Sequence, residues 1–302
     1  MGLASLGRMS PLTTTSVHSG DLLDQYRLEA LVAKGGMASV FRATDTNTGR
    51  VVAVKIPHQW KLCDPYVLDR FRYETEIGKK FDHPGLVKVL SNGDASDRYA
   101  VMEWVEGQLL REIMEEQEML PVERAVRIAL AICDALAHIH GHGVVHGDLK
   151  PDNVMVAAGA TIKLIDFGIA RDIRVNVWKR ERLGEAVGTP DYVSPEQITG
   201  KRTDARSDVY SLGIMLFEML TGEVPFSGLD PFTAMNLRLL VDPLPACEIN
   251  PEISPRLNAI VQRALARNRA NRYASAREFA SDLSEFLAQE FAAQPLESLA
   301  SV

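Results

Sequence analysis

Five polar side chains crowd into the ten residues VVHGDLKPDN, from Val144 to Asn153. Pro151 excludes a helix interior, and so many polar groups exclude a buried strand, so the stretch is predicted to be a loop. With Asp166, which follows the next predicted strands, Asp148 and Asn153 supply hard oxygen atoms of the kind that bind Mg²⁺ and, through it, phosphate. Asp148 could also orient an attacking hydroxyl and accept its proton. An ordinary Asn/Asp-rich turn explains the stretch equally well when it is taken alone.

A second group of candidate residues lies nearer the N-terminus. Gly35-Gly36 joins two predicted strands, and such a turn lets backbone N–H groups approach a phosphate. Lys55 ends the apolar run Val51–Val54 and could meet a phosphate or the carboxylate of Glu74. An ordinary hairpin and a solvent-facing lysine remain simpler explanations of each feature by itself.

The elements that would position these residues change character along the chain. Three strands are predicted first, at Tyr26–Lys34, Met37–Thr44 and Arg50–Pro57. A helix follows that begins at Pro65 and is capped by Asp64, and two further strands are predicted at Leu86–Leu90 and Arg98–Trp104. From residue 108 onward helices dominate, at Pro121–Ile139, Val209–Leu220, Ser254–Ala266 and Ser275–Leu287, with short strands at Val154–Val156 and Thr161–Ile165. The first of these helices is apolar on nearly every face, which is typical of a helix buried within a domain. A strand-rich part followed by a helix-rich part predicts two lobes.

Composition narrows the classes of protein that the chain can represent. The 302 residues carry a net charge of −7, so nothing suggests nucleic acid as a partner. No apolar run reaches the roughly 18 residues of a membrane span, and no signal peptide is evident. The three cysteines are far apart and lack metal-ligand spacing, which predicts reduced thiols and a cytoplasmic location.

In chain order, these patterns resemble the motifs of the protein kinase family across residues 26–290. Val32–Val40 matches the glycine-rich loop, Val52–Lys55 the phosphate-binding lysine motif, and Glu74 the glutamate that holds this lysine. His146–Asn153 matches the catalytic loop, Asp166–Gly168 the metal-binding motif, and Gly188–Glu196 the end of the activation segment. Asp208 matches the aspartate of a buried helix, and Arg272 an arginine that pairs with Glu196. The resemblance implies an α+β fold with a small β-rich N-terminal lobe, a larger helical C-terminal lobe and an ATP cleft between them.

The resemblance also implies a role for each matching residue. Asp148 would orient the acceptor hydroxyl, Lys150 would neutralise charge on the phosphoryl group, and Lys55, held by Glu74, would bind the α- and β-phosphates. Mg²⁺, with Mn²⁺ as the alternative, would be held by Asn153 and Asp166. The residues implied in nucleotide binding as a whole are Val32, Gly35, Gly36, Val40, Ala53, Lys55, Met102, Glu103, Val105, Met155, Asn153 and Asp166. Thr189, on the substrate shelf, would bridge Asp148 and Lys150.

The chain departs from the family pattern at two places. The glycine-rich loop has Ala33 and Ala38 where the family has glycine, which predicts a stiffer loop because alanine tolerates a positive φ poorly. Gly147 stands where the family has an arginine that meets a phosphate on the activation loop. The corresponding loop here, residues 171–187, contains no Ser, Thr or Tyr that could be phosphorylated. Without a loop phosphate an arginine at position 147 would have no partner, so the missing arginine and the missing hydroxyls are consistent with each other. They predict a kinase that is active without activation-loop phosphorylation, with a regulatory partner on this basic segment as a further hypothesis.

Two alternatives compete with a protein kinase acting on Ser and Thr. The catalytic-loop pattern also resembles small-molecule phosphotransferases related to aminoglycoside and choline kinases. Three features argue against them and favour protein acceptors: Lys150, the Asp166-Phe167-Gly168 motif and the Gly188–Glu196 segment. A non-catalytic scaffold would normally lack one of the catalytic residues, and all are present. The predicted extents are a Ser/Thr-rich lead-in at 1–25, the kinase domain at 26–290 with lobes of about 26–104 and 108–290, and a tail at 291–302.

Overall fold

The computed structural model describes residues 17–36, 38–58, 65–90, 98–157, 161–166, 171–172 and 190–291. Contacts divide the chain into two compact units. Unit 1 takes its residues from Met1–Thr75 and Val89–Trp104, and unit 2 takes its residues from Glu76–Lys88 and Val105–Val302. Predictions for the N-terminal residues 1–16, the segment 173–189 with Thr189, residues Phe167–Gly168 and the tail beyond 291 concern parts outside the described residues.

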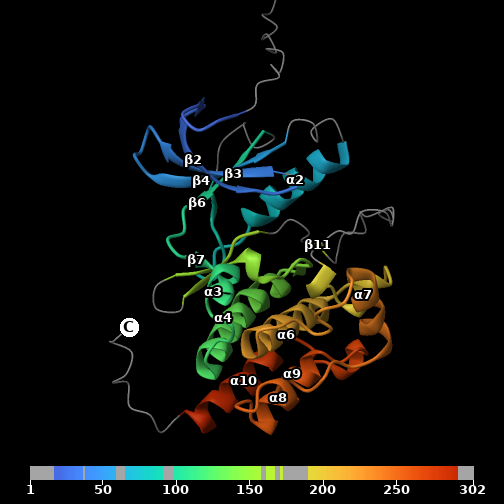
Figure 1. Ribbon diagram of the computed structural model, residues 1–302. Coiled ribbons are helices and arrows are strands. Elements are labelled where there is room, and N and C mark those ends of the chain that lie inside the picture. Colours follow the sequence, from blue (N-terminus) through green and yellow to red (C-terminus); the bar gives the residue numbers. More distant parts are fainter. Residues whose placement is uncertain are drawn as a thin grey trace, which may run out of the picture. The chain divides into compact units, whose positions relative to one another are not determined.

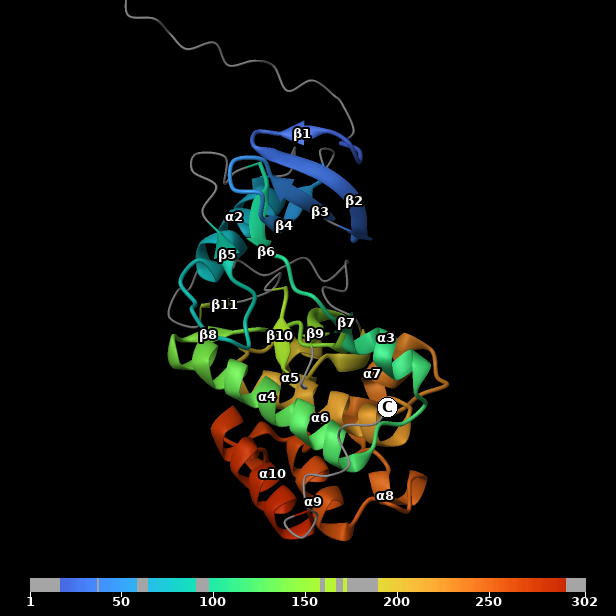
Figure 2. The same cartoon turned by 90° about the vertical axis from the view of Figure 1, so that its left-hand side faces the viewer.

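Unit 1 is built on a six-stranded antiparallel sheet in the order β1-β2-β3-β4-β6-β5 (Figures 1 and 2). The strands are β1 Leu22–Leu23, β2 Tyr26–Lys34, β3 Ala38–Asp45, β4 Val51–Pro57, β5 Val89–Leu90 and β6 Ala100–Glu103. Alternating apolar side chains fill one face with a core of Tyr26, Leu28, Phe41, Ala43, Val52, Val54, Tyr99 and Val101.

Helix α2 runs from Pro65 to Gly78. It begins at the proline that the sequence predicted for its first turn, while the predicted cap Asp64 lies outside the described residues. The strand predicted at Leu86–Leu90 is shorter in the structure: only β5 belongs to the sheet of unit 1. Leu86 instead forms an isolated bridge with Leu164, where Val87 N–H donates to the Leu164 carbonyl and Leu164 N–H donates to the Gly85 carbonyl, so this part of the chain belongs to unit 2.

Unit 2 is mainly helical. Its helices are α3 Leu110–Glu116, α4 Val122–Gly141, α5 Pro195–Ile198, α6 Ala205–Thr221, α7 Pro231–Leu240, α8 Ala246–Ile249, α9 Pro255–Ala264 and α10 Ala276–Glu290, with 3₁₀ turns η2 Pro151–Asn153, η4 Pro190–Tyr192 and η5 Arg269–Asn271. Figure 1 shows α4 beside α6 and α10. Helix α6 is buried along nearly its whole length, whereas α4 has a buried face and an exposed one.

Short strands in unit 2 flank the predicted site residues Asp148, Asn153 and Asp166. β7 Gln108–Leu109, β9 Val154–Val156 and β10 Ile162–Leu164 form a three-stranded sheet in the order β10-β9-β7, and β8 Val144–Val145 pairs with β11 Arg171–Asp172. Helices α3 and α7, of seven and ten residues, were not predicted, and neither were the four-residue helices α5 and α8.

Two further properties concern the described part of the chain. None of its helices is long and apolar enough to cross a membrane. Cys133 is buried and Cys247 is partly exposed, both as free thiols, and Cys63 lies outside the described residues.

Candidate active site

A buried aspartate on α6 anchors the loop that holds Asp148. Asp208 accepts hydrogen bonds at 2.8 Å from the backbone N–H groups of both His146 and Gly147, and one at 2.7 Å from His140 Nε2. Burial by itself raises the pKa of Asp208, but the hydrogen bond and charge of His140, with the loop groups, bring the pKa below its ordinary value. The backbone of the loop at His146 and Gly147 is therefore held by the buried, ionised carboxylate of Asp208.

Gly147 adopts a left-handed backbone conformation, with φ of +77°. This conformation is strained for an L-residue with a side chain, whereas glycine adopts it freely. The backbone geometry thus supplies a reason for glycine that is independent of any phosphate on the activation loop.

Asp148 and Lys150 face each other at the end of this loop. The distance from Lys150 Nζ to Asp148 Oδ2 is 3.5 Å, and each side chain is one-fifth exposed. Between them in the sequence, Leu149 is buried and holds the loop on the helical core. The two charged groups that the resemblance assigns to proton acceptance and charge neutralisation are therefore adjacent and reachable from solvent.

Antiparallel pairing of β9 and β10 brings Asn153 close to Asp166. The register pairs Val154 with Leu164, and Ile165 N–H donates to the Asn153 carbonyl at 3.0 Å. Asn153 is buried, and its Nδ2 donates to the Asp148 carbonyl at 2.8 Å. With its nitrogen engaged, the amide presents its oxygen as a ligand.

This oxygen donor set fits a magnesium ion that takes its other ligands from phosphate and water. Among the described residues there is no group of three or more His, Cys, Asp and Glu side chains that could hold a metal ion. A site of one amide and one carboxylate therefore depends on the oxygens of a bound nucleotide.

In unit 1, β4 and α2 join the lysine and the glutamate that the sequence singled out. Lys55 Nζ donates to Glu74 Oε1 at 2.6 Å, and both side chains are about 85% buried. The pairing of Lys55 with Val40 on β3 and with Ala100 on β6 places the lysine within the sheet rather than at its edge. A lysine held in this way has a restricted position from which to meet an anion.

The glycine-rich turn joins β2 to β3. Gly35 N–H donates to the Ala38 carbonyl at 2.9 Å, and His58 Nε2 lies 2.8 Å from the Gly35 carbonyl. Ala33 pairs with Val40 in the ladder, and neither Ala33 nor Ala38 has a positive φ. The two alanines therefore impose no backbone strain on this turn.

The remaining residues predicted to bind nucleotide are distributed over both units. In unit 1, Val40 and Ala53 lie on β3 and β4, Ala53 pairs with Met102, Val52 pairs with Glu103, and Val32 is exposed on β2. In unit 2, Met155 lies in the middle of β9, and Val105 precedes β7. Each lies within or next to a strand, so its backbone position is defined.

A charged network beside the catalytic loop was not predicted. Arg111 on α3 donates to Glu218 Oε1 at 2.9 Å and to the hydroxyl of Tyr192, which donates to Glu218 Oε2 at 2.5 Å. Arg111 Nε also lies 3.7 Å from Asp152. The partners are up to 107 residues apart in the chain, so no spacing rule could have found them.

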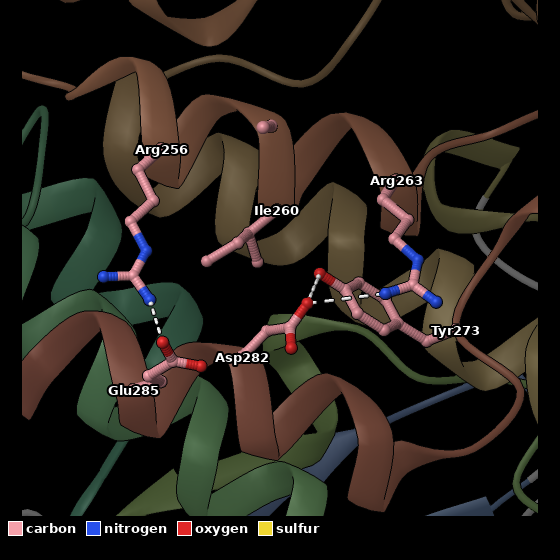
Figure 3. A pocket seen from close by; sticks show the side chains of 7 residues that line it. Arg256, Ile260, Arg263, Tyr273, Asp282 and Glu285 are labelled. Atoms are coloured by element: carbon pink, nitrogen blue, oxygen red, sulfur yellow. Dashed lines mark hydrogen bonds and ion pairs between the residues drawn. The ribbon is translucent and has the colours of Figure 1, made fainter.

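A pocket between α9 and α10 lies apart from these residues (Figure 3). Its lining residues are Arg256, Ala259, Ile260, Arg263, Tyr273, Asp282 and Glu285. Arg256 pairs with Glu285 at 3.0 Å and Arg263 with Asp282 at 3.4 Å, so each arginine in the pocket already has a carboxylate partner. None of the predicted site residues lines it.

Comparison with known proteins agrees with this arrangement. The family model described as "Protein kinase domain" matches residues 26–285. The chain belongs to the protein kinase family. Among curated kinases, the chain is 39% identical over 275 residues to the serine/threonine-protein kinase PknB of Mycolicibacterium smegmatis, covering 89% of this chain and 44% of that protein.

Other relatives give the same result. The probable serine/threonine-protein kinase PknB of Corynebacterium glutamicum is 37% identical over 271 residues, which cover 87% of this chain and 42% of that kinase. The chain thus spans less than half the length of these curated kinases. The crystal structure of the PknI kinase domain of Mycobacterium tuberculosis aligns with a TM-score of 0.70 at 26% identity, covering 89% of this chain and 99% of that domain. The predicted α+β kinase fold is confirmed.

Proposed function

We propose that this kinase transfers the γ-phosphoryl group of ATP to Ser or Thr hydroxyls of proteins. The observation that carries the proposal is the placement of Asp148 beside Lys150 at 3.5 Å, on a loop whose backbone Asp208 and Asn153 hold. Named relatives that share 37–39% of the sequence are serine/threonine-protein kinases, which supports the same reaction class. Phosphoryl transfer depends mainly on positioning and electrostatics, so a few well-placed charges suffice.

Each of the predicted residues has a part in the proposed reaction. Asp148 orients the acceptor hydroxyl and takes its proton, while the Lys150 ammonium offsets charge on the phosphoryl oxygens. Lys55, held by Glu74, binds the α- and β-phosphates. Mg²⁺ on Asn153 and Asp166, or Mn²⁺ in its place, would neutralise the negative charge of the phosphates.

The nucleotide base and the acceptor are assigned to the residues predicted for them. Ala53, Val40 and Met155 contact the adenine, the backbone of Glu103 and Val105 hydrogen-bonds to it, and Met102 limits the space behind it. Val32, Gly35 and Gly36 cover the phosphates. Thr189, outside the described residues, is proposed to bridge Asp148 and Lys150 on the substrate shelf.

We propose further that activity does not require a phosphate on the activation loop. Gly147 offers no charge to such a phosphate, and residues 171–187 offer no hydroxyl to carry one. Five basic against three acidic residues in that segment give an acidic regulatory partner a surface to bind. The kinase domain is proposed to span 26–290, between a lead-in at 1–25 and a tail at 291–302, in a protein acting in the cytoplasm.

A labelled-ATP assay tests the proposed reaction. The chain is incubated with a mixture of protein substrates, and in parallel with an aminoglycoside and with choline, and labelled proteins are analysed for phosphoamino acids. Phosphoserine and phosphothreonine are expected. Transfer only to the small alcohols would point to a small-molecule phosphotransferase, phosphotyrosine would contradict the acceptor class, and no transfer to any acceptor would favour a scaffold.

A further inference from the structure

The backbone immediately before Asp148 has more conformational freedom than usual, because residue 147 is a glycine. The residue before it, Gly147, has no side chain and a φ of +77°. The direction in which the Asp148 carboxylate points depends on the orientation of the Gly147–Asp148 peptide group. Something other than a side chain at position 147 must therefore fix that peptide.

One side of Gly147 is fixed by Asp208, which accepts the Gly147 N–H at 2.8 Å. The other side is fixed by Gln197 on α5, fifty residues further along the chain, whose Nε2 donates to the Gly147 carbonyl at 2.8 Å. That carbonyl belongs to the peptide that leads into Asp148. The peptide N–H of Asp148 itself faces His146 Nδ1 at 3.3 Å.

The orientation of the Gln197 amide is determined from both ends. Its Oε1 accepts from the backbone N–H of Ser194 at 3.1 Å and lies 2.8 Å from the Ser194 hydroxyl. A backbone N–H can only donate and a carbonyl can only accept, so the amide oxygen faces Ser194 and the amide nitrogen faces Gly147. The Gln197 amide therefore links Ser194, at the start of α5, to the backbone of Gly147 on the loop that carries Asp148.

We infer that Gln197 is a positioning residue that holds the peptide preceding Asp148 and so keeps the carboxylate in the geometry needed to accept the hydroxyl proton. The inference rests on the proposed function, in which Asp148 is the proton acceptor. It assigns the rigidity of the loop to a glutamine on the segment that follows the activation segment. Because small displacements of a reacting group are costly, loss of this contact lowers turnover without changing nucleotide binding.

Gln197→Glu separates the positioning role from a purely structural one. The glutamate keeps an oxygen for Ser194 but, when ionised, sets an acceptor against the Gly147 carbonyl. At about pH 8 we expect kcat to fall about 10-fold, with KM for ATP changed less than about twofold. Burial against the Gly147 carbonyl disfavours the charged form and should raise the pKa of the introduced carboxyl above its ordinary value of about 4.3. As the pH is lowered toward about 5 the carboxyl therefore becomes protonated and regains a donor, so the ratio of variant to wild-type kcat rises. The other charged or titratable groups near the contact are His146, Asp148, Lys150, Glu196 and Asp208, so wild type and Gln197→Met are measured at every pH as references.

Two further variants complete the test. Gln197→Met removes both the donor and the acceptor, and we expect low kcat with a pH-independent ratio to wild type. Thr199→Val is the matched control at the end of the same helix, because the hydrogen bonds of the Thr199 hydroxyl to described residues go to the Pro195 and Glu196 carbonyls, and its kcat stays unchanged.

The outcomes against the inference are distinct from failure of the proposed function. A Gln197→Glu enzyme with wild-type kcat would overturn the inference. A loss of kcat that does not change with pH, in a variant whose melting temperature is also clearly lowered, would overturn it as well, because it would indicate a purely structural role. If the wild-type enzyme transferred no phosphate to any protein, the proposed function would fail instead.

Discussion

Arg272 and Glu196, which are 76 residues apart in the chain, form a bidentate buried ion pair. Nη1 donates to Oε1 at 2.8 Å and Nη2 to Oε2 at 2.9 Å, while the Ser207 hydroxyl donates to Oε1 at 2.6 Å. The guanidinium carbon also lies 4.6 Å from the centroid of the Tyr210 ring. The pair ties the segment that carries Gln197 to the turn before α10.

Removing the arginine leaves a buried carboxylate without its partner. We expect Arg272→Met to lower the free energy of unfolding by about 3–5 kcal/mol, measured by urea denaturation. Arg269→Met is the control, because Arg269 pairs with Asp204 at 3.4 Å near the surface and its loss costs about 1 kcal/mol or less. Equal losses in the two variants would contradict the assigned importance of the buried pair.

The same pair predicts how stability depends on pH. Burial by itself raises the pKa of Glu196, but the hydrogen bonds and charge of Arg272, with Ser207, bring the pKa below its ordinary value of 4.5. A carboxyl whose pKa is lower in the folded state stabilises the fold above its unfolded pKa, and loses this effect as the pH falls through the folded pKa. The difference in unfolding free energy between wild type and Arg272→Met should therefore shrink below about pH 4.5. A constant difference across this range would show that Glu196 does not titrate as described.

Asp148 and Asp166 should differ in their effects on the reaction. Asp148→Asn removes the proposed proton acceptor, so we expect phosphoryl transfer to fall by about 10²–10⁴-fold while Mg·ATP binding, measured by calorimetry, stays nearly intact. Asp166→Asn should abolish transfer and also weaken Mg·ATP binding, because it removes a proposed charged ligand of the metal. Wild-type turnover in both variants would show that the site is assigned wrongly.

Replacing Gly147 by a residue with a side chain should destabilise the fold, because Gly147 has a left-handed backbone conformation. Gly147→Ala forces an L-residue to keep a φ of +77°, so we expect a loss of about 1–2 kcal/mol in the free energy of unfolding. Gly141→Ala is the control, because Gly141 ends α4 with an ordinary φ and has open space where the alanine methyl group would lie. There the substitution should be neutral or stabilising by up to about 1 kcal/mol. Similar losses at both positions would argue against the role of the left-handed conformation.

Activity without activation-loop phosphorylation predicts the response to phosphatase. Treating the purified enzyme with phosphatase should leave its activity unchanged. Gly147→Arg should not raise it, because residues 171–187 offer no hydroxyl to carry a phosphate for the arginine, and because a side chain at a φ of +77° is itself strained. Loss of most activity on dephosphorylation would show that a phosphate elsewhere controls the enzyme.

Any autophosphorylation should occur mainly near the N-terminus, since residues 173–187 contain no hydroxyl acceptor. The expected sites share a Ser/Thr-rich setting and are Ser10, Thr13, Thr14, Thr15, Ser16 and Ser19. Replacing all six by alanine should remove most of the label incorporated from ATP. Undiminished labelling would place the acceptors elsewhere.

The sequence by itself determined the family and the order of the strands and long helices, and it supplied the residues proposed for catalysis. These features are local: Lys55 ends an apolar strand, Asp148 and Asn153 lie on one loop, and Gly222 ends α6 in a left-handed conformation, as glycine does at helix ends. Alternation and helical repeats report which face of an element is buried, so elements with several turns or strand pairs were predicted close to their observed bounds.

Beyond the Lys55–Glu74 and Arg272–Glu196 pairs, which the family resemblance implied, only the tertiary structure decided which distant groups meet. The bridge from Gln197 to the Gly147 carbonyl, the Arg111–Glu218–Tyr192 network and the left-handed backbone of Gly147 have no signature in residue spacing. Hydrogen bonds between side chains and a distant backbone depend on how helices pack, and packing is a property of the folded chain as a whole. The residues that carry charge in the proposed reaction, and the Lys55–Glu74 and Arg272–Glu196 pairs, were therefore expected from the sequence and its family resemblance, whereas the contacts that hold the loop of Asp148 in place were not.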